Sequence, residues 1–81
     1  MPTAKKIGPY RLFFVSSDFH EPPHVHVQRE KMVAKFWLDP MTLAKNRGFS
    51  MVELNRIAKM VEENKIELLE KWYEFFGKSQ S

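Results

Sequence analysis

The chain has 81 residues, with 13 Lys and Arg against 10 Asp and Glu, a net charge of +3 and no cysteine. This length allows one small domain without a second core, and the lack of cysteine excludes disulfides and thiolate metal sites. No apolar run reaches the ~20 residues of a membrane span, and the first residues do not resemble a signal peptide, so we expect a cytoplasmic protein that contacts no membrane.

The charge is unevenly distributed along the chain. Residues 1–49 carry eight basic and four acidic side chains, whereas residues 50–81 carry five basic and six acidic ones. A basic first half favours contact with phosphate or with an acidic protein, although ordinary surface lysines would give the same count. We expect a single domain over residues 1–81, with an ordered core over about 7–77.

Three strands are predicted in the first half. Residues 10–17 are rich in aromatic and β-branched side chains and apolar on both faces, which is typical of a covered strand. Ser, Asp and Pro mark a loop over residues 16–23. Residues 24–29 and 33–38 form the second and third strands, on either side of a charged turn at Glu30 and Lys31.

All three histidines lie in the segment HEPPHVH, at positions 20–26. The two prolines keep the chain extended as it reaches His24. Side chains alternate between the faces of a strand, so His24 and His26 share one face.

The turn after the second strand sets its register against the third. Valines of the second strand then meet Ala34 and Phe36 of the third on one apolar face, which supports this pairing. The opposite face carries three cross-strand pairs: His24 with Trp37, His26 with Lys35, and Gln28 with Val33.

Two helices are predicted in the second half. Asp39 is a good N-cap and Pro40 suits the first turn of a short helix that continues to residue 45, with Gly48 placed to end it. Ser50 and Glu53 match the capping-box pattern of a second helix, which runs through residue 76. Its core stripe recurs at helical spacing: Leu54, Ile57, Ala58, Val61, Leu68, Trp72 and Phe75.

A straight helix of this length would extend for about 40 Å, which exceeds the diameter of so small a domain. Either it bends near Asn64, which falls on the apolar stripe, or its end projects toward a partner. Aromatic residues crowd that end and cannot all face one stripe, so it is a candidate surface for oligomerisation or partner docking: Trp72, Tyr73, Phe75 and Phe76. The predicted fold is α+β, a three-stranded, mainly antiparallel sheet followed by a short helix and one long helix packed on its Val25/Phe36 face.

Four segments together resemble the DUF4160 family of small bacterial proteins: EPPHVHV (21–27), AKFWLDP (34–40), RGFS (47–50) and ELLEKW (67–72). The resemblance covers about residues 7–77 and assigns the motif positions to His24, His26 and residues 35–38. It implies no established activity, but it implies pairing with a DUF2442 protein in a proposed toxin–antitoxin module. This chain departs from many relatives at residues 30–32, where they have a Gly-containing turn, and His20 lies outside the motif.

The interpretation that we favour for the histidine-bearing face is a contact surface. It would bind a partner protein, such as a cognate DUF2442-like protein, or RNA, without a cofactor. Tryptophan is frequent in interface hot spots, so Trp37 is expected to contribute most, with Gln28 and Arg11 beside it. A homo-oligomer formed through the sheet or through the aromatic helix end is a further expectation.

Two catalytic alternatives remain open. In a metal-independent ribonuclease, His24 and His26, roughly 6–7 Å apart, would act as acid and base, and Lys35 would stabilise the phosphorane charge. In a zinc-dependent hydrolase, His24 and His26 would bind the metal together with His20 or Glu21.

Overall fold

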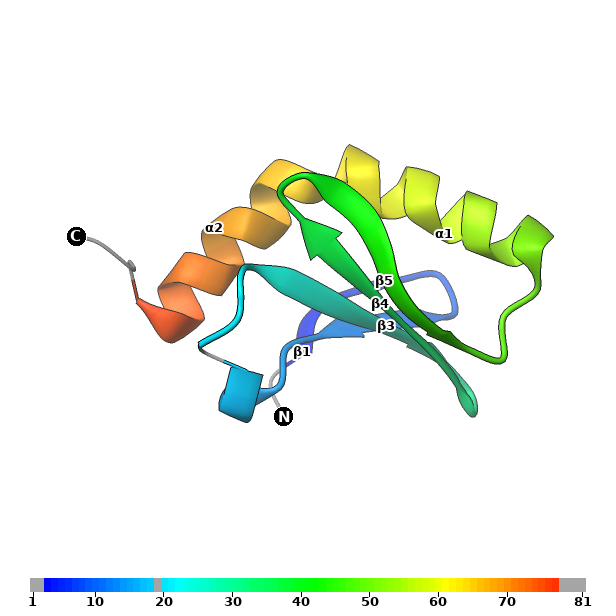
Figure 1. Cartoon of the computed structure of the whole chain (residues 1–81), viewed down its shortest axis with the longest axis horizontal. Coiled ribbons are helices and arrows are strands. Elements are labelled where there is room, and N and C mark those ends of the chain that lie inside the picture. The colour runs from blue at the N-terminus through cyan, green and yellow to red at the C-terminus, as the bar shows by residue number, and fades with distance from the viewer. Residues whose placement is uncertain (1–2, 19, 78–81) are drawn as a thin grey trace.

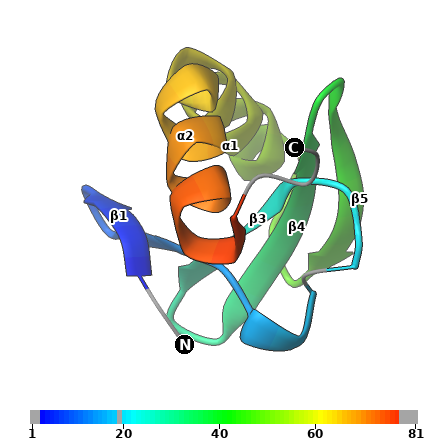
Figure 2. The same cartoon turned by 90° about the vertical axis from the view of Figure 1, so that its left-hand side faces the viewer.

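The computed structural model describes residues 3–18 and 20–77, which form one sheet and two helices (Figure 1). The sheet is five-stranded and antiparallel, with its strands in chain order. Its strands are β1 (Thr3–Ile7), β2 (Tyr10–Phe13), β3 (His24–Arg29), β4 (Met32–Leu38) and β5 (Met41–Arg47). A short 3-10 turn, η1 (Ser16–Asp18), interrupts the link from β2 to β3. Figure 2 shows both helices on one side of this sheet.

The α+β class is confirmed, but the expected three-stranded sheet is wrong because the sheet has two further edge strands. β1 begins at Thr3, before the expected ordered core, and β5 occupies the segment for which a short helix was predicted. Asp39 and Pro40, joined by a cis peptide bond, connect β4 directly to β5. These residue types favour tight turns as well as helix starts, and pairing along β4 stabilises the turn here.

The predicted pairing between β3 and β4 is confirmed along its whole length. His24 lies opposite Trp37, His26 opposite Lys35, and Gln28 opposite Val33. The first predicted strand is shorter than expected, since β2 ends at Phe13. The helices pack on the predicted apolar face, so the sheet face with the polar pairs faces away from them except at His24, whose ring lies 5.0 Å from that of Trp72.

The predicted long helix is two helices, α1 (Met51–Glu63) and α2 (Lys65–Phe76). Of the two alternatives for its length, the bend is confirmed: Asn64 leaves helical geometry with φ −109° and ψ 13°, and its side-chain amide donates to the Met60 carbonyl at 2.8 Å. The predicted N-cap is also present, because the Ser50 hydroxyl accepts from the Glu53 amide at 3.2 Å.

The core lies between the sheet and the inner faces of the two helices. The predicted helical stripe is buried at five of its positions: Leu54, Ile57, Val61, Leu68 and Trp72. Of the other two positions, Ala58 is partly buried and packs against the core, whereas Phe75 has 43% of its surface exposed. Its ring stays in contact with Phe14 and Phe76 at the edge of the core.

A carboxylate on α1 joins this helix to the sheet. Glu53 accepts two hydrogen bonds from Arg29, at 2.7 and 2.8 Å, and one from the Tyr10 hydroxyl at 2.7 Å. The Arg29 guanidinium, followed by the Tyr10 hydroxyl, holds the pKa of Glu53 below its ordinary value of 4.5. Burial, with the neighbouring Glu53, raises the pKa of Tyr10.

Glu53→Gln is expected to lower the free energy of unfolding at neutral pH and to flatten its dependence on acid pH. Because the folded-state pKa of Glu53 is lowered, its stabilisation is complete above pH 4.5 and is lost as the pH falls through the folded-state value. Urea denaturation between about pH 7 and about pH 3 measures this difference. Glu63→Gln, an exposed change on the same helix, is the control and should leave the wild-type profile intact; equal profiles for both variants would contradict the role of Glu53.

Candidate functional site

The helix-free face of the sheet carries the predicted site and extends it onto β5. Lys45 lies opposite Lys35 and Arg47 lies opposite Val33 across the β4–β5 pair. Neither cation was among the predicted site residues, because the sequence pattern assigned their segment to a helix or its end. The strand pairing therefore adds two positive charges beside the predicted His26–Lys35 pair.

His24 does not reach the surface of this face. Its side chain is 0% exposed, and its ring lies 5.0 Å from the Trp72 ring of α2 and 5.5 Å from the Trp37 ring. Nδ1 lies 2.9 Å from the Pro22 carbonyl, which only accepts hydrogen bonds, so Nδ1 carries a proton. His24 thus links the 20–23 loop, β4 and α2, and it is not placed to touch a large partner.

Of the two strand histidines, His26 is the one that remains accessible. It is half-buried and stacks on the Phe13 ring with centroids 5.2 Å apart and planes 19° apart. The rings of His24 and His26 are also 5.2 Å apart, so the predicted pair is adjacent. Because only His26 reaches the surface, the two imidazoles do not flank an open site as the ribonuclease alternative requires.

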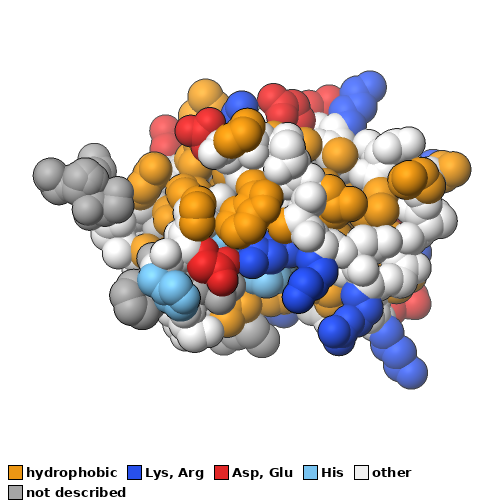
Figure 3. All heavy atoms as spheres, viewed as in Figure 1, with side chains coloured by type: hydrophobic (Ala, Val, Ile, Leu, Met, Phe, Trp, Pro, Cys, Tyr) orange, Lys and Arg blue, Asp and Glu red, His pale blue; other side chains and the backbone are white. Residues whose placement is uncertain are grey.

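A hollow of about 270 Å³ opens beside His26. Its lining comes from β3, β4 and β5, and three of the six residues are Lys or Arg: His26, Val33, Ala34, Lys35, Lys45 and Arg47. Figure 3 shows Lys and Arg side chains gathered below the helices, next to a histidine. Such a concentration of positive charge attracts anionic groups.

Two other predicted residues already have partners on this face. Lys35 donates to Glu21 at 2.7 Å, and its ammonium lies 4.6 Å from the centre of the Trp37 ring. Arg11 donates to Gln28 at 3.3 Å and lies 4.5 Å from the centre of the Phe13 ring. These contacts hold the two cations in place at the sheet surface.

Lys45 and Arg47 differ from Lys35 and Arg11 in their electrostatic surroundings. Both side chains are exposed, and over residues 3–18 and 20–77 neither lies within ion-pair distance of a carboxylate. We call the whole surface the basic sheet face, which consists of Arg11, His26, Gln28, Lys35, Trp37, Lys45 and Arg47.

The zinc alternative lacks a ligand set in the described part of the chain. No group of three His, Cys, Asp or Glu side chains there is arranged to hold a metal ion. His20 is exposed in the loop, whereas His24 is buried with Nδ1 directed at the Pro22 carbonyl. Across the same residues, no helix has the length and apolar character needed to span a bilayer.

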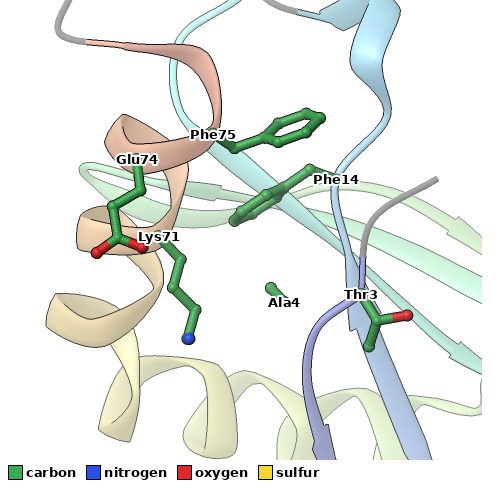
Figure 4. A pocket seen from close by; sticks show the side chains of 6 residues that line it. All are labelled: Thr3, Ala4, Phe14, Lys71, Glu74 and Phe75. Atoms are coloured by element: carbon green, nitrogen blue, oxygen red, sulfur yellow. The ribbon is translucent and has the colours of Figure 1, made fainter.

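The aromatic end of α2 forms a separate surface at the other edge of the sheet. A hollow of about 250 Å³ lies between α2 and β1, with the Phe14 and Phe75 rings at one end and Ala4, Thr3 and Lys71 around it (Figure 4). Tyr73 is also 36% exposed. Oligomerisation through this end of α2 stays a prediction.

A family model described as a domain of unknown function, DUF4160, matches residues 10–73, which is most of the chain. The matched segment includes β2 to β5, α1 and most of α2. No curated protein and no solved structure shows a significant match.

Proposed function

Since the chain belongs to the DUF4160 family, a family whose function is unknown, we propose from its surface that it is a binding protein whose basic sheet face docks on an acidic surface of a partner protein. The observation that carries this proposal is the position of Lys45 and Arg47. Both lie at the rim of a hollow on an uncovered sheet face, without a carboxylate partner among the described residues. Carboxylates of a partner would supply the missing charge.

The aromatic side chains favour a protein over single-stranded RNA as the occupant. RNA bases need accessible ring faces on which to stack. Phe13 is only 6% exposed, with His26 stacked on it, and the Lys35 ammonium lies against the Trp37 ring. The cations of this face are therefore more available to a ligand than its rings are.

The DUF2442-like protein implied by the family resemblance is the first partner that we propose. In this account the two proteins form a toxin–antitoxin-like module in a bacterial cytoplasm, and this chain contributes the basic half of the interface. The burial of His24 favours this assignment over the ribonuclease alternative, because a proton donor and a proton acceptor must both reach the substrate.

Isothermal titration calorimetry with the purified DUF2442-like protein tests the proposal. We expect a saturable complex whose affinity falls steeply as salt rises from about 50 to about 500 mM, because screening weakens contacts between surface charges. Absence of a complex at low salt, or an affinity that does not change with salt, would contradict the proposal.

Glu21→Gln is expected to strengthen this complex by about two- to fivefold at low salt. Glu21 places a negative charge against Lys35 in the basic sheet face, where it competes with carboxylates of a partner. The same titration measures the change, with the exposed α2 change Glu74→Gln as a control that should have no effect. Weaker binding by Glu21→Gln would mean that the Glu21–Lys35 pair orients Lys35 for the partner.

A further inference from the structure

β5 leaves one edge of the sheet open. It is the last strand in the sheet order, and six of its seven residues are exposed. Figure 2 shows it at the border of the sheet, on the opposite side from β1. Along such a strand, every second residue directs its backbone N–H and C=O away from the sheet, where another strand can pair with them.

The side chains of β5 separate by chemistry across its two faces. The cross-strand pairs put Lys45 and Arg47 on the side of the basic sheet face, beside Lys35 and Val33. Leu43 lies opposite the buried Phe36, on the helix side, and is 46% exposed. A strand added here would meet cations on one face and an apolar side chain on the other.

The positive charge of β5 favours a segment of a different protein over a second copy of this chain as the added strand. Two β5 strands paired edge to edge would bring four cations together without a carboxylate from β5 itself, and such like-charge pairs are destabilising. The register shift between Lys35 and Phe36 leaves Ala44 as an extra residue, and such bulges hinder long, flat self-pairing. A short acidic strand meets neither obstacle.

We propose that the β5 edge accepts an extended segment of the partner protein as a sixth strand. The segment would carry acidic residues at alternate positions, facing Lys45 and Arg47, with apolar residues between them facing Leu43. Main-chain hydrogen bonds supply affinity in this mode of recognition, and alternate side chains supply specificity. This inference rests on the proposed function, since it specifies how the same acidic partner reaches the basic sheet face.

Amide hydrogen exchange of the full chain, followed by NMR, tests the inference. The partner is the DUF2442-like protein, and a second probe is a capped peptide of about eight residues in which valine and glutamate alternate. We expect both to slow exchange about tenfold or more at alternate amides of β5. A peptide with the same composition but with its glutamates in one block should give no such protection.

Charge variants identify the edge that binds. Lys45→Glu with Arg47→Glu should abolish protection by the alternating peptide, whereas Lys6→Glu, an exposed change on the opposite edge strand, should retain it. Equal loss in both would overturn the assignment to β5. Protection of the same amides by a mixed-sequence RNA oligonucleotide would overturn the assignment to an acidic protein segment.

The titration with the DUF2442-like protein separates two negative results: a wrong docking mode and a wrong proposed function. If the DUF2442-like protein binds and shifts resonances of the basic sheet face without protecting β5 amides, docking is face-on and the sixth strand is excluded. If it does not bind at all, the proposed function itself is wrong.

Discussion

Lys45→Glu combined with Arg47→Glu is expected to weaken the complex with an acidic partner by at least about 100-fold at low salt. Both cations lie at the hollow, and within the described ranges neither has a carboxylate at ion-pair distance. Their replacement turns two attractive contacts into two repulsive ones. Both side chains are exposed, so the fold should persist.

Calorimetric titration of the double variant measures this loss, and circular dichroism checks that the variant is folded. Lys59→Glu is the control, because it reverses one exposed charge on α1, away from the sheet face. The control should retain most of the affinity. A similar loss in both variants would show that net charge, and not the basic sheet face, governs binding.

His24→Ala is expected to lower the free energy of unfolding by about 2–4 kcal/mol. The change removes a fully buried ring that contacts the Trp37 and Trp72 rings, and it breaks the hydrogen bond to the Pro22 carbonyl. It leaves a cavity where the loop, β4 and α2 meet.

Urea denaturation measures this loss of stability. His20→Ala is the control: this histidine is exposed in the loop, and its replacement should change stability by less than about 0.5 kcal/mol. If His24→Ala were as stable as the wild type, His24 would not join these elements, and the acid–base role would regain support.

The cross-strand neighbours of the histidines could be predicted from the sequence because strand periodicity is local. Once Val27 is paired with Ala34, every other pair on the two strands follows, and the structure has the same pairs. The Ser50 cap was likewise predictable from local residue preferences, whereas the break at Asn64 was one of two alternatives that the length of the predicted helix left open.

The basic half of the face was not predicted, because it depends on whether the residues after Asp39 and Pro40 pair with β4. Asp39 and Pro40 fit a helix start as well as a hairpin turn, and only pairing with β4 decides between them. Read as a turn, they would have placed Lys45 and Arg47 beside Lys35 and Val33. The turn-forming character of Asp39 and Pro40 was therefore the local signal that could have placed Lys45 and Arg47 in the site.

The burial of His24 could not be predicted from strand periodicity either. Alternation correctly put His24 on the polar face with His26, but it says nothing about what covers each end of that face. Two groups cover the His24 side chain: the 20–23 loop just before it, through the Pro22 carbonyl, and Trp72, which follows it by 48 positions. The candidate site therefore consists of His26 with the cations of β4 and β5, and not of the predicted pair His24/His26.

The basic sheet face is proposed to bind an acidic protein partner. The most direct test is a map of backbone amide NMR shifts of this chain as the DUF2442-like protein is added. We expect the largest shifts on β4 and β5, around Lys35, Lys45 and Arg47, and little change on the exposed sides of α1 and α2. Shifts concentrated on the helices, or at the aromatic end of α2, would contradict it.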